Sequence, residues 1–270
     1  MRSGTSWLYQ VLKSHPQIFM PDHVKELHFF DKYYDRGISW YRSFFSVNGE
    51  MPAYKAGGEI TPMYLYNKDV PARVQKHLPN TKFIVLLRNP VQRAYSHFRM
   101  AFFEGTTRAR SFPDFIKNDP TAFDRGSYAA QLRRWFEYFP ADKFLILISD
   151  EVFQMPDQAL ASIASFLGVQ AHGFDRSLIE NKANPSHAPK LPELYHAGIE
   201  LRNFLRRNDF NRVSSFVVKT GSRFFKFLGS SKNNLPPLDR NIEKELLESY
   251  QPDMLDLEKI LQRDLSLWQN

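Results

Sequence analysis

The chain has 270 residues, of which 43% are hydrophobic and 24% charged, and its formal net charge is +7. Cysteine is absent from the sequence, which excludes a disulfide framework, a thiol nucleophile and a cysteine-based zinc site. No apolar run approaches the roughly 20 residues of a membrane span, and residues 1–7 lack the apolar stretch of a signal peptide. We therefore expect a soluble, cytoplasmic protein whose basic character suits an anionic partner.

Helical and strand patterns alternate along the chain. Helices are predicted at residues 7–13, 70–78, 91–103, 126–138, 156–167, 190–208 and 241–262. Strands are predicted at residues 53–60, 82–87 and 144–148, and the last two are the uninterrupted apolar runs of strands buried on both faces. This alternation predicts an α/β fold with a mostly parallel central sheet flanked by helices, in a single domain over residues 1–270.

The first candidate site is a glycine-containing turn that runs into the first predicted helix, Arg2-Ser3-Gly4-Thr5-Ser6. Free N–H groups at the start of a helix bind phosphate or sulfate. The three hydroxyls add donors, and Arg2 adds a fixed positive charge. Taken alone, the same residues also suit an ordinary helix cap. The Walker pattern GxxxxGK[ST] is absent from the sequence, which argues against an ordinary P-loop kinase.

The second candidate pairs Arg88 with Ser96. Arg88 follows the apolar run 82–87, and ligands of parallel sheets bind beyond the carboxyl ends of the strands. Ser96 lies two turns into the following helix, so both side chains could bind one anion. The alternative is that Arg88 caps the sheet and Ser96 lies on the surface.

The third candidate is Glu26, which stands shortly before Phe29 and Phe30. A carboxylate among aromatic side chains can have a raised pKa and act as a general base. A glutamate beside a lysine, here Lys25, is more often a surface residue. The sequence alone leaves both interpretations open.

A strongly basic segment covers residues 202–232, in which Asp209 is the only acidic residue. The usual interpretation of such a run is a solvated helix face followed by a loop. Two functional alternatives are a lid over an anionic ligand and a surface that contacts an anionic membrane or an acidic polymer.

Together the three candidates resemble the sulfotransferases that use 3′-phosphoadenosine 5′-phosphosulfate (PAPS), in particular the bacterial and heparan sulfate-type carbohydrate branch. Residues 2–6 match the loop that grips the 5′-phosphosulfate, and residues 88–96 match the element that grips the 3′-phosphate. Glu26 stands in the position of the family's catalytic base. Residues 125–128 look like the start of the helix that lines the nucleotide pocket. The resemblance covers nearly the whole chain.

The resemblance implies an enzyme that transfers the sulfuryl group of PAPS to a hydroxyl or amine, with adenosine 3′,5′-bisphosphate as product. The acceptor would be a saccharide, and neither a metal nor a nucleic acid would be involved. Glu26 and Arg2 would be catalytic, although many members have Lys in place of Arg2. The donor would be bound by Arg2, Ser3, Gly4, Thr5, Ser6, Arg88, Ser96 and Tyr128.

The implied fold is P-loop-like. Members of the family have a strand directly before the phosphosulfate loop, whereas only Met1 precedes Arg2 here. We therefore expect the first strand of the sheet to be missing from this chain. Two other functions stay open at this point: a kinase-like phosphotransferase, and a non-catalytic protein that binds acidic glycans.

Overall fold

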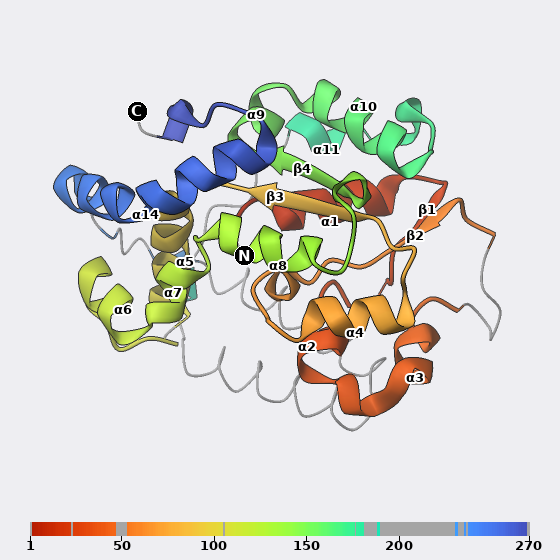
Figure 1. Cartoon of the computed structure of the whole chain (residues 1–270), viewed down its shortest axis with the longest axis horizontal. Helices are drawn as coiled ribbons and strands as arrows, with labels where there is room; N and C mark the ends of the chain where they lie inside the picture. Colours follow the sequence, from red (N-terminus) through yellow and green to blue (C-terminus); the bar gives the residue numbers. More distant parts are fainter. Residues whose placement is uncertain are drawn as a thin grey trace. The chain divides into compact units, whose positions relative to one another are not determined.

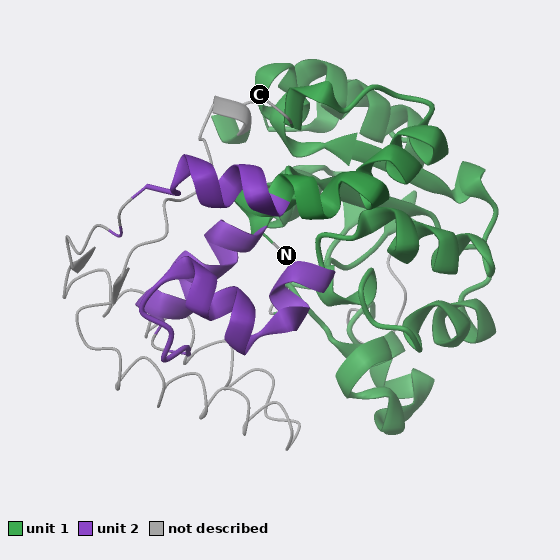
Figure 2. Cartoon of the chain, turned by 60° about the vertical axis from the view of Figure 1, so that its left-hand side comes forward, with its two compact units in different colours: residues 1–93, 125–183, 247–270 green, residues 94–124, 184–246 purple. Residues whose placement is uncertain are grey.

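The computed structural model describes residues 2–22, 24–46, 53–104, 106–175, 177–180, 188–189, 230–231, 235 and 237–268. The predicted helix 190–208 and almost all of the basic segment 202–232 lie outside the described residues. The chain divides into two compact units (Figure 2). Unit 1 comprises residues 1–93, 125–183 and 247–270, and unit 2 comprises residues 94–124 and 184–246. That residues 1–270 form a single domain stays a prediction.

Unit 1 contains most of the helices and the longer strands (Figure 1). Its helices are α1 (Thr5–Ser14), α2 (Phe29–Lys32), α3 (Gly37–Ser43), α4 (Val70–His77), α8 (Tyr128–Phe136), α9 (Ser149–Gln154), α10 (Pro156–Leu167) and α11 (Ser177–Glu180). Its strands are β1 (Ile18–Phe19), β2 (Ala56–Gly57), β3 (Phe83–Leu87) and β4 (Phe144–Ile148). Short 3-10 helices cover Tyr34–Arg36, Pro62–Tyr64, Ala141–Lys143, Ala171–Gly173 and Ser266–Trp268.

Unit 2 contains α6 (Phe112–Asn118), α7 (Pro120–Asp124) and the strand pair β5 (Ala188–Pro189) and β6 (Ser230–Ser231). Its described core is aromatic, because Phe98 contacts both Phe112 and Phe115. Two helices have residues in both units: α5 (Pro90–Phe103) and α14 (Arg240–Leu261).

Most of the predicted elements in the described part of the chain are confirmed. Six predicted helices lie in the described residues and correspond to α1, α4, α5, α8, α10 and α14. The two ends of each lie within two residues of the predicted ends. Gly168 has a φ of 73° at the end of α10, the left-handed conformation expected of a terminating glycine. The strand predicted at residues 53–60 is much shorter, because only Ala56 and Gly57 pair, in parallel with β1.

The sheet formed by β3 and β4 separates two layers of helices. The strands pair in parallel from Phe83 opposite Phe144 to Leu87 opposite Ile148. Alternate strand residues, including Ile84 and Leu86, pack with α1 and α10. Phe83 and Phe144 pack in the cluster that contains residues of α4 and α8. Figure 1 shows the strands side by side between α10 and α8. This arrangement confirms the predicted α/β architecture with helices on both faces of a parallel sheet.

The two strands are less buried than their apolar sequences predicted. Only Leu86, Leu87 and Ile148 are buried, and the other seven strand residues are partly exposed. Among the described residues, β3 and β4 form a two-stranded sheet, so each has a strand neighbour on one edge only. An apolar run predicts helices above and below a strand, but it does not predict how many strands lie beside it.

A carboxylate from α14 holds the start of α8. Asp253 accepts hydrogen bonds from the backbone N–H groups of Ala129 (3.1 Å) and Ala130 (3.2 Å). Ser127, at the N-cap position, makes no side-chain capping bond of its own. The carboxylate therefore takes the place of a local cap at the helix that carries Tyr128.

We expect Asp253→Ala to lower the free energy of unfolding by about 1–2 kcal/mol, because two N–H groups at the helix start lose their acceptor. Urea denaturation measures this change. Asp256→Ala is the matched control on the same helix, since Asp256 pairs with the exposed Arg133 and such pairs contribute little. Equal losses in the two variants would contradict a capping role for Asp253.

Candidate functional site

The turn before α1 has a shape that requires glycine. Gly4 has a φ of 91°, a left-handed conformation that other residues adopt at a cost. A Cβ atom at Gly4 would lie 3.0 Å from the ring of Phe153, so the ring would have to shift to admit a side chain. Ser3 is buried next to this turn, and the N–H of Leu8 begins the helix by donating to the carbonyl of Gly4. Residues 2–6 thus form the tight turn into a helix that the sequence predicted.

Hydrogen bonds join this turn to two other predicted site residues. The Arg88 guanidinium donates to the carbonyl of Arg2 through Nη1 (3.3 Å). The hydroxyl of Tyr128 donates to the carbonyl of Arg88 (2.9 Å). Burial raises the pKa of Tyr128, so its hydroxyl stays protonated and able to donate at neutral pH. Arg2, Arg88 and Tyr128, which are far apart in the sequence, therefore meet at one place in unit 1.

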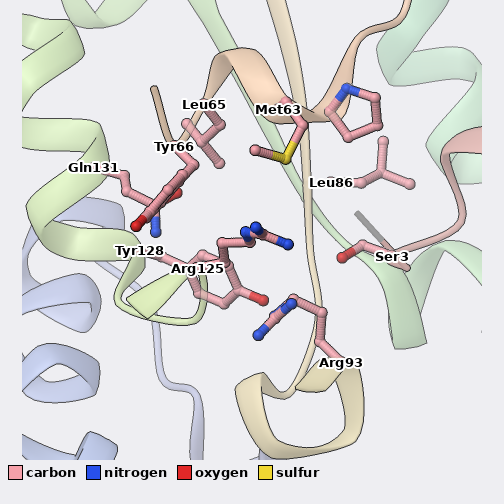
Figure 3. Close-up of a pocket in the computed structure, with 10 residues that line it drawn as sticks. Ser3, Met63, Leu65, Tyr66, Leu86, Arg93, Arg125, Tyr128 and Gln131 are labelled. Atoms are coloured by element: carbon pink, nitrogen blue, oxygen red, sulfur yellow. The ribbon is translucent and has the colours of Figure 1, made fainter. Parts of the chain in front are cut away.

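A pocket with two guanidinium groups opens beside Ser3. In Figure 3 the side chain of Arg125 projects into the space between Ser3, Arg93 and Tyr128. None of the described lining residues is acidic, so two positive charges and several hydroxyl groups face the same space. Such a pocket suits a ligand with negatively charged oxygens. Its lining consists of Ser3, Pro62, Met63, Leu65, Tyr66, Leu86, Arg93, Arg125, Tyr128 and Gln131.

The helix that follows β3 carries both Arg93 and Ser96. Asn89 caps the start of α5, because its side-chain oxygen accepts from the N–H groups of Val91 and Gln92 (both 3.0 Å). This cap sets the position of Arg93, which is 1% exposed and lines the pocket. Ser96 lies further along the same helix and belongs to unit 2. Its expected convergence with Arg88 stays a prediction.

The side chain of Lys25 connects the turn before α1 to the candidate base. Its Nζ atom lies 3.1 Å from the hydroxyl of Ser6, 3.4 Å from that of Thr5 and 3.2 Å from Oε1 of Glu26. The predicted base and the predicted anion-binding turn are therefore neighbours, with one ammonium group in contact with both. The sequence did not indicate this role for Lys25, because a Lys–Glu pair is usually a surface feature.

The pKa of Glu26 is lowered, which is opposite to the raised value considered from its aromatic neighbours. Burial of its carboxylate acts to raise the pKa, but the hydrogen bond from His28 and the charge of Lys25 outweigh it and lower the pKa to about 2. The Nε2 atom of His28 lies 3.3 Å from Oε2 of Glu26. Phe29 and Phe30, which suggested a raised value, pack in a hydrophobic cluster, whereas two basic groups hold the Glu26 carboxylate in its charged form.

His28 lies between two carboxylates. Its Nδ1 atom is 2.9 Å from Oδ2 of Asp31, and its Nε2 atom faces Glu26. Burial acts to lower the pKa of His28, but the hydrogen bonds to Asp31 and Glu26 outweigh it and raise the pKa. The spacing of His28 and Asp31 at i and i+3 around the start of α2 was the signal in the sequence that could have identified this pair.

With this geometry established, comparisons with known proteins identify the family. The model of the sulfotransferase domain family matches residues 1–211. The chain belongs to the sulfotransferase family. This assignment confirms the resemblance that the turn 2–6, the element 88–96 and Glu26 indicated.

Curated relatives of this sulfotransferase come from the heparan sulfate branch. Heparan sulfate glucosamine 3-O-sulfotransferase 6 of Mus musculus is 32% identical over 256 residues, which are 83% of this chain and 70% of the relative. The human 3-O-sulfotransferase 3B1 is 27% identical over 93% of this chain and 58% of its own length. The human bifunctional heparan sulfate N-deacetylase/N-sulfotransferase 3 is 26% identical over 97% of this chain and 29% of its own length. The chain thus spans little more than half the length of the human 3-O-sulfotransferases 3B1 and 3A1.

A solved structure supports the fold. The crystal structure of a sulfotransferase from Alicyclobacillus acidocaldarius matches 100% of this chain and 95% of its own, with a TM-score of 0.66 and 22% sequence identity. This likeness confirms the predicted P-loop-like sulfotransferase fold. Within the described residues of this sulfotransferase, no group of three or more His, Asp or Glu side chains could hold a metal ion. None of the helices that the structure describes is both long and apolar enough to cross a membrane.

Proposed function

We propose that this sulfotransferase transfers the sulfuryl group of PAPS to a hydroxyl or amine of a saccharide. The bond between sulfur and the phosphate oxygen of the donor breaks, and a bond from sulfur to the acceptor oxygen or nitrogen forms. Adenosine 3′,5′-bisphosphate leaves, and the acceptor gives up one proton. The observation that carries this proposal is the contact of Lys25 with both the turn 2–6 and Glu26.

Donor binding is assigned to the turn and the basic pocket. The backbone of residues 4–6 at the start of α1 and the hydroxyls of Thr5 and Ser6 would hold the phosphosulfate. Arg88 and Ser96 would hold the 3′-phosphate, as the family motif implies. Arg93 and Arg125 line the adjacent pocket and would add positive charge for the three anionic groups of the donor.

Glu26 is assigned as the base that takes the acceptor proton. With a pKa of about 2, its carboxylate is charged and ready to accept a proton at neutral pH. So weak a base takes the proton late, once the forming bond to sulfur has made the acceptor O–H or N–H acidic. Arg2 and Lys25 would stabilise the negative charge that grows on the sulfuryl and leaving phosphate oxygens.

A saccharide acceptor is favoured by the relatives and by the charge of the chain. The relatives named above are sulfotransferases of heparan sulfate, and their names include both O- and N-sulfation. The net charge of +7 suits an acidic polysaccharide.

An assay with PAPS labelled in its sulfuryl group tests the proposal. The 270-residue chain is incubated with labelled PAPS and a panel of unsulfated and partly sulfated glycosaminoglycans. We expect the label to move to at least one saccharide and to need Glu26. A panel of phenols, peptides and lipids serves as the comparison. Transfer to one of those and to no saccharide would contradict the acceptor class, and no transfer at all would contradict the activity.

We expect the protein to bind adenosine 3′,5′-bisphosphate more tightly than AMP by roughly 1.5–3 kcal/mol, the value of charge-assisted hydrogen bonds to the extra phosphate. Isothermal titration calorimetry measures both affinities. Arg88→Met should remove most of the difference, whereas Arg133→Met, at an exposed residue that pairs with Asp256, should leave it unchanged. Equal affinity of the unaltered chain for the two nucleotides would contradict a 3′-phosphate site.

A further inference from the structure

The segment that carries Glu26 and His28 is held by a second carboxylate, that of Glu59. Glu59 accepts three hydrogen bonds: from the hydroxyl of Thr61 (2.6 Å), from the hydroxyl of Tyr64 (2.8 Å) and from the backbone N–H of Leu27 (3.2 Å). Part of the residue remains exposed, but its carboxylate is enclosed by these donors. Burial of that carboxylate raises its pKa to about 7 although all three hydrogen bonds act to lower it.

The same side chains bind the backbone of the neighbouring segment. The N–H of His28 donates to the hydroxyl oxygen of Thr61 (3.3 Å), and the N–H of Phe30 donates to the hydroxyl oxygen of Tyr64 (3.3 Å). With the bond from Leu27, three backbone N–H groups of residues 27–30 therefore donate to Glu59, Thr61 and Tyr64. We call these three side chains the Glu59 network. Each hydroxyl accepts a hydrogen bond from a backbone N–H of the segment and donates one to the Glu59 carboxylate. The hydrogen bonds therefore all lead from the segment towards that carboxylate.

The backbone that this network holds is an unusual one. His28 has a φ of 54° and a ψ of 28°, the left-handed conformation, which costs free energy for a residue with a side chain. In this conformation the ring of His28 reaches Asp31 through Nδ1 and Glu26 through Nε2. A right-handed or extended backbone at residue 28 would change the direction of its side chain relative to Asp31 and Glu26. Hydrogen bonds to the N–H groups on both sides of His28 offset the cost of the left-handed turn.

We infer that Glu59, Thr61 and Tyr64 are positioning residues for sulfuryl transfer, which keep His28 in its left-handed turn and so hold Glu26 in place to take the acceptor proton. The inference rests on the proposed function. It assigns no contact with donor or acceptor to the Glu59 network. Its effect is geometric, because a displacement of a reacting group by about 1 Å can cost roughly 100-fold in rate.

The test uses two substitutions at Thr61, one that removes the hydroxyl and one that keeps it. Thr61→Val keeps the shape and the neutral charge of the side chain but removes the hydroxyl that accepts from His28. Thr61→Ser restores the hydroxyl and serves as the rescue. We expect Thr61→Val to lower kcat roughly 10- to 100-fold, Thr61→Ser to recover most of that loss, and both variants to bind adenosine 3′,5′-bisphosphate like the unaltered chain. Equal kcat values for the two variants, fast or slow, would overturn the inference.

A second readout is independent of activity. The ring signals of His28 in nitrogen-15 NMR spectra, assigned by their loss in His28→Gln, report its contacts with Asp31 and Glu26. We expect Thr61→Val to shift them and Thr61→Ser to leave them in place. If the unaltered chain transfers no sulfuryl group, the proposed function fails while this readout still tests the network. A slow Thr61→Val protein with unchanged His28 signals would show that Thr61 acts by another route and would overturn the inference.

Tyr64→Phe covers the case in which Thr61→Val does not fold, as judged by circular dichroism. It removes the acceptor of the Phe30 N–H and one of the three donors to Glu59. We expect the same pattern, a loss of kcat with unchanged nucleotide affinity and shifted His28 signals. A Tyr64→Phe protein with the kcat and the His28 signals of the unaltered chain would overturn the role of the network.

Discussion

Replacing Glu26 with glutamine is expected to lower the turnover of sulfuryl transfer on the order of 100-fold or more, the usual contribution of a general base. The amide keeps the size of the side chain but cannot take the acceptor proton. The affinity for adenosine 3′,5′-bisphosphate should change little, because in the proposed reaction Glu26 contacts the acceptor and not the nucleotide. Steady-state kinetics with saturating PAPS measures turnover, and calorimetry measures the affinity.

The matched control for this substitution is Glu137→Gln, at an exposed position at the end of α8. It changes the net charge by the same amount and should leave turnover unaltered. If Glu26→Gln turns over at the rate of the unaltered chain, Glu26 is a structural partner of Lys25 and His28 and the base lies elsewhere. If the Glu26→Gln protein fails to bind the nucleotide, its loss of turnover reflects a disturbed turn 2–6 and does not support base catalysis.

Replacing Lys25 with methionine is expected to lower turnover by roughly 100- to 1,000-fold, the range for the loss of one group that stabilises charge in a transition state. The ammonium of Lys25 lies within 3.5 Å of the hydroxyls of Thr5 and Ser6 and of the Glu26 carboxylate. In the proposed reaction it therefore stands where charge changes most during transfer. The affinity for the nucleotide product should fall much less, because that charge is largest in the transition state.

Two further variants separate the possible causes. Lys25→Arg keeps the charge and should retain more turnover than Lys25→Met. Lys76→Met removes an exposed lysine of α4 and should have no effect. Equal losses of turnover and of nucleotide affinity in Lys25→Met would indicate plain ground-state binding. If Lys25→Met leaves the turnover unchanged, Lys25 forms only the surface ion pair with Glu26 that its sequence context suggested.

The sequence of this protein determined most of its local elements and pointed to candidate site residues. The apolar runs in residues 82–87 and 144–148 predicted two parallel strands with helices on both faces, because only such cover makes continuous apolar strands favourable, and β3 and β4 confirm the pairing. The glycine at position 4 predicted a turn into the first helix, and the structure gives Gly4 a φ of 91° at the start of α1. Arg2, Arg88 and Tyr128 were identified from their motifs, and the structure brings all three together.

Only the tertiary structure decided the pKa of Glu26 and the hydrogen bonds that hold its segment in place. The pKa of Glu26 depends on the distances to Lys25 and His28, and the aromatic residues next to it in the sequence suggested the opposite shift. The role of Glu59 depends on hydrogen bonds to a segment about 30 residues earlier in the chain. Hydrophobic periodicity is a local property and is visible along the chain. The position of a charge relative to a distant partner is set by folding, and electrostatic energy depends on that separation and on the burial around it.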